Sequence, residues 1–527
     1  MINARDEDIM KTVQAVAGHF RGTDSAASAA YGSENVFSLR SFLLILLAWM
    51  ILWTVWPSLC IGNVSIDVAE NVAWGANFQF GYDKNPYFGA WLSWAVFRLC
   101  PSEYVFYLMS QLAVGLGLLA AYLLTFDVSG SRFAAFAAGV SALLITFFSH
   151  SACEFNDDVL SIALWGWSAL CLYRGVKRDS LKYWLAAGAV SGLALMTKYL
   201  AGALLLPLGL LLLATSEGRK CWKRPGVYLA GAVLLLLVLP NVIWLCRHDF
   251  IAVSYAFERA DLERSCGFGE RVVMVLETLR DFLSRLILPA AALLLFPRGP
   301  KTPTDAFGRK LMASVALGPL AFSLLFTLAT GGDVLTSWLT PYFVFSTPLL
   351  VLWYRPRPEP RALRRFAVFT VVAAVGFVAV FGYEYLHKRP YLKRGVAYNV
   401  WPGRAVADRL TRLWRERYGT RLPYVVGDRC ASCNVTFYSP DRPTAFFDHR
   451  SDLSPWIDPA DVRRRGAAVV WTGKTPPYLD LYAGKVVPLP DMKPERAGVG
   501  WYRRLAGPLR TVTIHAAFLP PTTDGKQ

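Results

Sequence analysis

Residues 42–56 read FLLILLAWMILWTVW, an uninterrupted apolar run without a charged side chain. The run lies inside a longer apolar segment from Ser41 to Ile61. A helix needs about 20 residues to cross the hydrocarbon core of a bilayer, so this segment predicts a transmembrane helix. The segment is too long for a signal peptide, and the preceding residues 1–35 are polar with mixed charge, so no cleavable signal is expected.

Similar apolar runs recur through the first three quarters of the chain. They cover residues 108–126, 133–148, 227–244, 286–296, 311–329, 343–353 and 366–381. The chain has 527 residues, of which 54% are hydrophobic and 18% charged, and a soluble protein of this length would be more charged. We therefore predict an all-α polytopic membrane domain over residues 41–387, preceded by a cytoplasmic segment, residues 1–40.

The apolar pattern predicts eleven transmembrane spans. Their bounds are roughly 41–61, 103–126, 133–149, 158–173, 183–197, 199–215, 226–246, 279–297, 311–330, 337–354 and 366–386. The fifth and sixth spans are short and are separated only by Lys198. A broken or re-entrant hairpin is therefore an alternative to two full crossings at this place.

Basic residues are distributed unevenly among the predicted loops. Loops 174–182, 219–224, 298–310 and 355–365 carry 4, 4, 4 and 5 Lys or Arg residues, whereas loop 62–102 has two and loops 149–157 and 331–336 have none. Only loop 247–271, with four, breaks the contrast. Because basic loops stay in the cytoplasm, we predict a cytoplasmic N-terminus and place loop 62–102 on the outer face of the membrane.

The composition changes near Lys388 to that of an ordinary globular domain. Residues 388–527 contain 24 Lys and Arg against 12 Asp and Glu, which is most of the net charge of +17. Segments 423–427, 467–471 and 511–514 favour strands, and residues 405–418 favour a helix. We predict a small extracytoplasmic α/β domain, whose basic charge suits either an anionic acceptor or anionic lipid headgroups.

Two of the nine cysteines, Cys430 and Cys433, form a Cys-x-x-Cys pattern in this C-terminal domain. No further ligands stand at a spacing that would complete a zinc site. A local disulfide or two unpaired thiols are the favoured interpretations, and metal or redox chemistry is the other.

Charged residues follow the first span closely, in the stretches DVAE at 67–70 and DKNP at 83–86. Both stretches lie in loop 62–102, whose Trp- and Phe-rich segments predict helices at headgroup depth. Charged groups at this depth stay ionised only where water, a partner or a substrate compensates them. The loop therefore predicts an acid/base group and a clamp for a phosphate.

Structural roles compete with this interpretation. Asp67 stands at a helix start, where a carboxylate can cap free N–H groups, and Glu70 three residues later fits a capping box. Asp157 and Asp158 stand at another helix start, where one of them can favour the helix dipole, although with Glu154 they also suggest a polar cavity or a cation site. Lys198 either extends to the headgroups or neutralises a lipid phosphate. Arg247 and Arg259 in loop 247–271 can bind an anionic headgroup, or are solvated charges.

At these residues the chain resembles the GT-C glycosyltransferases. The similarity follows the order Asp-x-x-Glu at 67–70, Tyr82-Asp83-Lys84-x-Pro86, Asn156-Asp157-Asp158 and Thr197-Lys198-Tyr199. It is closest to the bacterial members of the protein O-mannosyltransferase group, which includes the lipid A aminoarabinose transferases. The resemblance spans nearly the whole chain, and it implies a GT-C membrane domain in a bacterial inner membrane.

The resemblance also implies an activity. These enzymes move a sugar, with inversion, from a polyprenyl-phosphate donor to a lipid, glycan or protein acceptor on the outer face. Asp67 then matches the catalytic acid, with Asp157 or Asp158 as a second acidic position. Lys84 matches the lysine that binds the donor phosphate. Lys198, Arg247 and Arg259 are further candidates for phosphate binding. The candidate substrate contacts are Glu70, Tyr82, Asn156, Asp157 and Tyr342.

No cofactor is assigned from the sequence. Some relatives bind a divalent metal, for which Asp83 and His248 are weak candidates. The expected partners are the lipid-linked donor, the acceptor and membrane lipids, with no nucleic acid and a monomeric chain. A transporter or lipid-linked-sugar flippase is the alternative function, because it would use the same membrane-embedded charges. The chain shows no internal repeat, and its polar groups cluster on one face, which favours the transferase.

Overall fold

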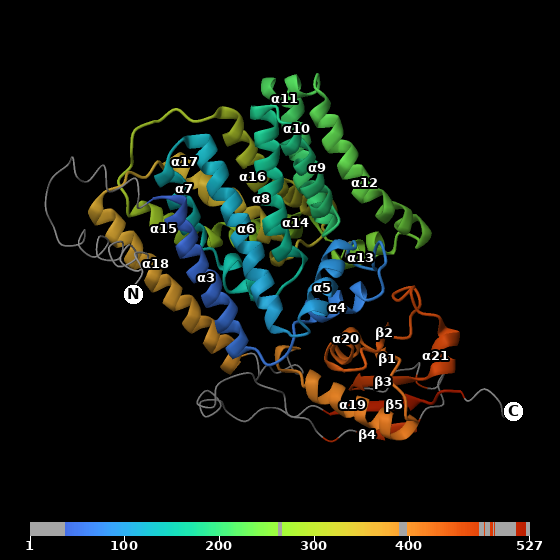
Figure 1. Ribbon diagram of the computed structural model, residues 1–527. Coiled ribbons are helices and arrows are strands. Elements are labelled where there is room, and N and C mark those ends of the chain that lie inside the picture. Colours follow the sequence, from blue (N-terminus) through green and yellow to red (C-terminus); the bar gives the residue numbers. More distant parts are fainter. Residues whose placement is uncertain are drawn as a thin grey trace, which may run out of the picture.

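The computed structural model describes residues 37–261, 266–388, 398–473, 479, 485–488, 490 and 513–522 (Figure 1). The predicted cytoplasmic segment, residues 1–40, falls almost wholly outside this part. The helices of the N-terminal three quarters are α3 (Leu39–Cys60), α4 (Ile66–Gly75), α5 (Phe88–Leu99), α6 (Tyr104–Ser129), α7 (Arg132–Ala142), η1 (Thr146–Phe148), η2 (Ser151–Cys153), α8 (Asp157–Arg178), α9 (Leu181–Leu195), η3 (Tyr199–Ala201), α10 (Gly202–Ala214), α11 (Ser216–Cys221), α12 (Pro225–Arg247), α13 (Ile251–Arg259), α14 (Phe268–Arg285), α15 (Ile287–Leu294), α16 (Ala306–Thr330), η4 (Thr336–Phe345), α17 (Ser346–Tyr354), α18 (Pro360–Tyr383) and the π-helical turn η5 (Glu384–Lys388).

The centre of the helical bundle is the packing of α8 against α6 and α9, and α9 in turn packs against α12. Small residues allow α6 and α8 to approach closely: a Cβ added to Gly117 would lie 2.7 Å from the carbonyl oxygen of Ile162. Helices in lipid associate through such close backbone packing, because the hydrophobic effect does not drive them together there. Gly117 and Gly166 therefore determine how closely α6 and α8 pack.

Six helices in the described part of the chain are long and apolar enough to cross a membrane, or seven if one bent pair counts as a span. The six are Leu39–Cys60, Tyr104–Ser129, Asp157–Arg178, Pro225–Arg247, Ala306–Thr330 and Pro360–Lys388. The bent pair is Arg132–Ala142 with Thr146–Cys153, at 83° to each other. The membrane-spanning helices are confirmed as a class, whereas the count of eleven is not.

The remaining predicted spans are shorter or interrupted helices. Segment 279–297 is divided between the end of the amphipathic α14 and the eight-residue α15. Segment 337–354 is a 3₁₀-helix containing Pro341 followed by the nine-residue α17. The doubtful hairpin consists of α9 and α10, with 15 and 13 residues and a break around Lys198. At 1.5 Å per residue none of these helices spans about 30 Å alone.

The loop between α3 and α6 is a compact structure and not a free linker. Its two helices α4 and α5 pack so closely that a Cβ at Gly75 would lie 2.2 Å from the carbonyl oxygen of Ala90. The segment between them is closed by a bridge that pairs Gly81 with Pro86. Figure 1 shows this loop between the helical bundle and the C-terminal part of the chain.

The C-terminal part contains a five-stranded mixed sheet in the order β2-β1-β3-β5-β4. Its elements are η7 (Tyr398–Val400), α19 (Gly403–Tyr418), β1 (Tyr424–Gly427), α20 (Arg429–Tyr438), β2 (Thr444–Phe447), α21 (Pro459–Arg465), β3 (Ala467–Thr472), β4 (Lys485–Pro488) and β5 (Ile514–Leu519). Strand β1 runs parallel to β2 and β3, whereas β5 is antiparallel to β3 and β4. The predicted strands at 423–427 and 467–471 correspond to β1 and β3, and only Ile514 of the third lies in a strand, since residues 511 and 512 are outside the described residues.

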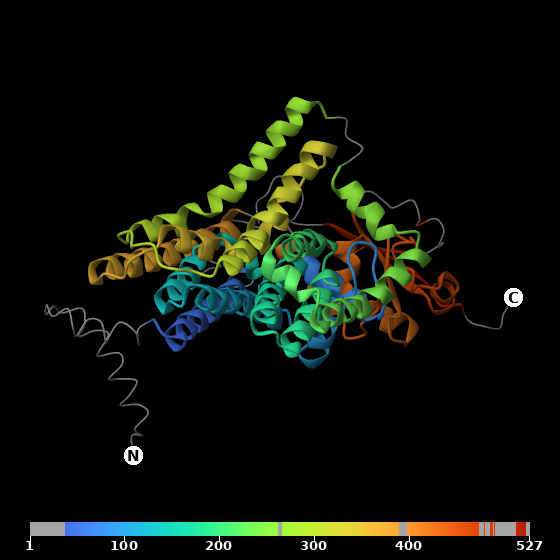
Figure 2. The ribbon, with the colours of Figure 1, turned by 90° about the horizontal axis from the view of Figure 1, so that it is seen from above.

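One apolar core joins the loop to the sheet. Trp74 and Phe97 of the loop belong to the same buried cluster as Trp414 of α19, Phe437 of α20 and Phe518 of β5. Helix α20 packs directly against α4. Because the sheet has no separate core on this side, its position relative to the loop is determined by continuous apolar burial. Figure 2 shows the yellow-green α14 and the yellow α16 extending side by side from the helical bundle.

We predict that Gly117→Ala lowers the thermal unfolding midpoint, because its Cβ would overlap Ile162 across the α6–α8 contact. Overpacking of this kind costs about 1–3 kcal/mol. The matched control is Gly231→Ala inside α12, where nothing lies within 4 Å of the added atom. Tryptophan fluorescence of the purified proteins in detergent measures both midpoints. Equal midpoints for the two variants would contradict a close α6–α8 contact.

Candidate functional site

Asp67 lies in the first turn of α4 and does not cap it. The helix begins after Ser65, whose side chain makes no capping hydrogen bond. Asp67 is half-buried, and no hydrogen bond or ion pair to its carboxylate is found among the described residues. Burial raises its pKa to about 6, with Glu70, Glu154 and Asp158 adding to the effect and Lys84 opposing it. The competing N-cap role is therefore wrong, and Asp67 keeps a raised pKa with no partner among the described residues.

Glu70 does not form the predicted capping box. It is 3% exposed, and both of its oxygens accept hydrogen bonds from Lys84 Nζ, at 2.7 and 3.0 Å. Arg429 Nη1 donates a further bond to Oε1. The Glu70 side chain therefore points at two cations and not at the start of α4.

Lys84 is the cation predicted to meet a phosphate, and the structure holds it beside Glu70. Burial disfavours its charged form, but Glu70 outweighs this effect and raises the pKa of Lys84 above its ordinary value. Its ammonium group also lies 5.8 Å from the ring centre of Trp74 and 5.7 Å from that of Tyr255 on α13. Lys84 therefore stays charged, and 20% of its side chain is exposed.

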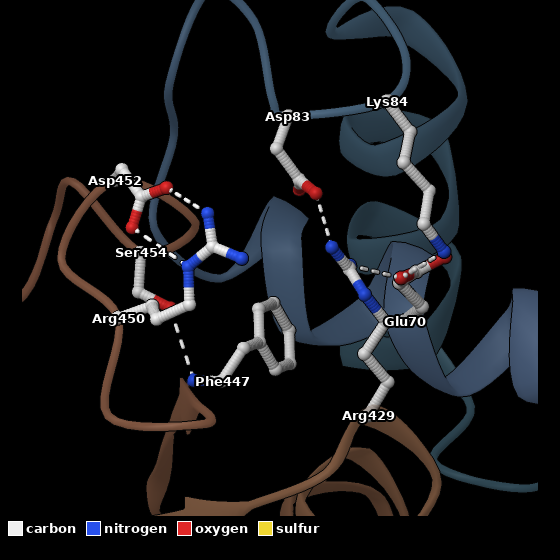
Figure 3. A network of polar contacts seen from close by, with 8 residues as sticks. All are labelled: Glu70, Asp83, Lys84, Arg429, Phe447, Arg450, Asp452 and Ser454. Atoms are coloured by element: carbon white, nitrogen blue, oxygen red, sulfur yellow. Dashed lines mark hydrogen bonds and ion pairs between the residues drawn. The ribbon is translucent and has the colours of Figure 1, made fainter. Parts of the chain in front are cut away.

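Asp83 and Arg429 complete the group, as Figure 3 shows. Asp83 is 1% exposed, and Arg429 Nη2 donates to its Oδ2. Burial raises the pKa of Asp83, and Arg429 opposes this increase. We refer to Glu70, Asp83, Lys84 and Arg429 as the charge cluster. Its two carboxylates and two cations come from the loop after α3 and from the start of α20.

Arg429 was not found by sequence reasoning. It is separated from Glu70 by 359 positions and from Asp83 by 346. It stands at the first position of an ordinary soluble-domain helix whose N-cap is Asp428. No motif marks it, so only the docking of α20 on α4 reveals its contact with the loop.

The acidic pair at the start of α8 lies beside the loop between α3 and α6. Asp157 Oδ2 accepts a bond from Asn85 Nδ2 at 2.7 Å, and a Cβ at Gly89 would lie 2.0 Å from Oδ1. Asn156 is the N-cap of α8, because its side chain accepts from the Val159 N–H at 3.0 Å. Asn156 thus has a structural role at the helix start, while Asp157 ties α8 to the segment beside Lys84.

Asp158 and Lys198 form an ion pair. Lys198 Nζ donates to Asp158 Oδ1 at 2.6 Å, and the ammonium group lies 5.3 Å from the ring centre of Trp338. The break between α9 and α10 brings Lys198 into this position. Lys198 is therefore neutralised by an acid, and it does not extend freely towards headgroups.

The two candidate tyrosines are packed inside the protein. Tyr82 is fully buried, stacks on Trp74 with ring centres 5.1 Å apart, and donates to the Trp74 carbonyl at 2.9 Å. Tyr342 is fully buried in η4, where it stacks on Trp165 and its hydroxyl bonds Ser323 at 3.0 Å. Both therefore have packing roles in this structure, and neither is exposed to a substrate.

The basic residues of the loop after α12 lie on the surface. Arg247 and Arg259 are exposed, at the ends of α12 and α13. His248 stacks on Trp244 with ring centres 4.1 Å apart. In the described part of the chain, no three His, Cys, Asp or Glu side chains are grouped to hold a metal ion, and Asp83 is engaged by Arg429. Neither weak metal candidate gains support from its contacts.

Cys430 and Cys433 follow Arg429 on α20, and both are unpaired thiols. Burial raises the pKa of Cys430 to about 12, so its thiol is protonated at neutral pH. Since the thiolate is the reactive form, this environment does not favour redox chemistry. Of the interpretations left open by the sequence, the structure contains the unpaired thiols.

Known proteins share this fold and part of this sequence. Residues 84–244, from Lys84 to Trp244, match the family described as dolichyl-phosphate-mannose-protein mannosyltransferase. The crystal structure of ArnT from Cupriavidus metallidurans bound to undecaprenyl phosphate superimposes with a TM-score of 0.59 at 15% identity, covering 93% of this chain and 100% of that one. The apo ArnT structure matches with the same TM-score over 95% of this chain. This chain has the GT-C fold.

One curated protein is similar to part of this chain in sequence. The lipid A galacturonosyltransferase RgtD of Rhizobium johnstonii is 27% identical over 225 residues, which is 41% of this chain and 46% of the relative. The match thus spans less than half the length of that protein. The family and this relative are named for sugar transfer, and the comparisons support a GT-C glycosyltransferase in the membrane.

We predict that Asp67→Asn removes a pH dependence of stability. Because the pKa of Asp67 rises from 3.8 to about 6 on folding, the folded wild type loses stability as pH rises from about 4 to 6, by at most roughly 3 kcal/mol. The loss is absent below pH 4 and complete above pH 6. Between pH 4 and 8, the thermal unfolding midpoint of Asp67→Asn relative to that of the wild type should therefore increase as pH rises.

The control for this measurement is Asp249→Asn, which changes an exposed aspartate after α12. Its midpoints should follow those of the wild type at each pH. If the wild type and Asp67→Asn also give parallel curves over the whole range, the raised pKa of Asp67 is refuted.

Proposed function

We propose that this chain is a membrane glycosyltransferase that moves a sugar from a polyprenyl-phosphate donor to an acceptor on the extracytoplasmic face, with inversion. The observation that carries the proposal is the Asp67 carboxylate, which has no hydrogen-bond or ion-pair partner in the described part of the chain and lies in one loop with the charged Lys84. The family match to a dolichyl-phosphate-linked transferase and the ArnT-like fold support it. The scarcity of basic residues in loop 62–102 supports the outer face.

The donor phosphate would bind Lys84. In this structure Glu70 holds the ammonium group, and 20% of the Lys84 side chain is exposed. An arriving phosphate replaces one carboxylate oxygen with another anionic oxygen, so Lys84 exchanges one ion pair for another. A fixed cation then stabilises the negative charge that develops on the phosphate as the sugar leaves.

Asp67 would act on the acceptor. Its carboxylate takes the proton of an acceptor hydroxyl while the acceptor oxygen forms a bond to the anomeric carbon. The bond from that carbon to the phosphate oxygen breaks, and its electron pair leaves with the polyprenyl phosphate. Attack opposite the leaving group inverts the carbon, and a positioned base of this kind contributes typically about 10²–10⁴-fold.

Asp157 and Asp158 would shape the site beside this reaction. Asn85 orients Asp157, and Lys198 neutralises Asp158. Among acceptors we favour a lipid, and lipid A first, since the curated relative is named for that acceptor. When the accepting group is itself a phosphate, it needs no deprotonation, and Asp67 then orients it. The sugar is identified by mass spectrometry of the cell's glycolipids with and without the chain.

We predict that Asp67→Asn and Lys84→Gln separate catalysis from donor binding. Asp67→Asn should lower kcat by about 10²-fold or more and leave the Kd for undecaprenyl phosphate within about twofold of wild type. Lys84→Gln should weaken that binding about tenfold or more, because the phosphate loses its cation. Transfer to lipid A and ligand-induced thermal shift measure the two effects, with Asp249→Asn as the control.

The pH profile tests the role of Asp67 as a base. Only its ionised form accepts a proton, so log kcat/KM should fall by one for each pH unit below about 6. A profile that is flat down to pH 5 in a wild type that does transfer sugar would leave Asp67 as an orienting group only. Wild-type transfer rates in Asp67→Asn would remove it from the reaction.

A further inference from the structure

Arg429 brings a charge of the C-terminal part into the loop of the candidate site. It lies at the start of α20, yet its guanidinium contacts Glu70 and Asp83, both on the other side of the interface with α4 (Figure 3). The guanidinium is also enclosed by rings, with centroids 5.9 Å away at Trp74 and 4.9 Å away at Phe447. Its side chain is only 19% exposed.

The charges of the charge cluster balance. Glu70 and Asp83 bring two negative charges, and Lys84 and Arg429 bring two positive charges. Both carboxylates are nearly inaccessible to water, with exposures of 3% and 1%. Water cannot screen them well, so the two cations must supply most of the compensation.

This balance matters when Lys84 turns to a phosphate. Glu70 then loses one of its two cations, and Arg429 is the other cation that contacts it within the described part of the chain. Without Arg429, a phosphate would enter beside two buried carboxylates that share a single lysine. A neighbouring like charge changes the occupancy of a charged site by roughly tenfold or more.

We propose that Arg429 is a positioning residue for donor binding: it holds Glu70 and Asp83 neutralised, so that Lys84 can leave Glu70 for the donor phosphate. The inference rests on the proposed function, because it assumes a phosphate as the ligand of Lys84. The inference also makes the C-terminal part a component of the site, since the Arg429 guanidinium reaches Glu70 and Asp83 only when α20 is docked on α4.

Arginine suits this role better than lysine. Its planar group donates to two carboxylates at once, whereas an ammonium group is a single point charge. The ring of Phe447 on one side is held in place because the Phe447 N–H donates to Ser454 Oγ at 3.1 Å. Arg429→Lys therefore keeps the net charge of the cluster but loses one of its two anchoring contacts.

The test measures the Kd of the purified full-length protein for undecaprenyl phosphate by tryptophan fluorescence in detergent. Arg429→Gln should raise the Kd about tenfold or more, and Arg429→Lys should raise it less. The double variant Asp83→Asn/Arg429→Gln removes one charge of each sign. It should return the Kd to within about threefold of wild type, an effect that a purely structural role of Arg429 would not produce.

Asp83→Asn alone keeps the test decisive if Arg429→Gln fails to fold. This variant leaves the cluster with one excess positive charge, so it should bind undecaprenyl phosphate more tightly than wild type. The control is Arg450→Gln, which removes an exposed arginine paired with Asp452 outside the cluster. Its Kd should stay within twofold of wild type.

The outcomes separate this inference from the proposed function. No binding of undecaprenyl phosphate by the wild type would overturn the donor class itself. Binding by the wild type with an equal Kd for Arg429→Gln would overturn the role of Arg429 alone. Weak binding by Arg429→Gln that the double variant does not restore would overturn the charge-balancing role, because a structural role of Arg429 or its direct contact with the phosphate would give that result.

Discussion

Two carboxylates buried at a membrane exit impose the constraint on which the rest of the site depends. Glu70 and Asp83 are almost fully removed from water, and a buried carboxylate is tolerated only when cations and hydrogen bonds compensate it. Lys84 supplies one cation from the same loop, and Arg429 supplies the other from the C-terminal part. The loop, its lysine and the docking of the C-terminal sheet are thereby connected through one electrostatic requirement.

Apolar packing makes this compensation geometrically possible. Helices α4 and α5 share a core with α19, α20 and one face of the sheet, so α20 begins opposite Glu70. Trp74 belongs to that core and also stacks on Tyr82, which places the segment carrying Asp83 and Lys84. The same residues thus stabilise the fold and direct the charged side chains towards one another. Asp67 lies in the same loop as Glu70, Asp83 and Lys84, and it has no ion pair among the described residues.

Sequence patterns predicted some elements well and others poorly for identifiable reasons. Long uninterrupted runs such as residues 42–56 became spanning helices, because hydropathy and length report the same property there. The apolar segments 286–296 and 343–353 did not, since hydropathy does not record where a helix is interrupted, as at Leu286 or at Phe345, where η4 ends and α17 begins. Glu70 was assigned to a capping box because the spacing of three residues serves equally well for a capping box and for a side chain aimed away from the helix start.

The sequence by itself determined that this is a multi-span membrane protein, that acids and a lysine gather after the first span, and that their order resembles that of GT-C glycosyltransferases. These properties depend on composition and local spacing, which can be read directly from the order of the residues. Only the tertiary structure decided which charges meet. Asp158 pairs with Lys198 across two helices, and Glu70 pairs with Arg429 across 359 positions, because such pairs form only after helix packing and domain docking bring distant segments together. Asp67 was visible in the sequence, but only the positions of the neighbouring charges showed that its carboxylate has no ion pair within the described part of the chain.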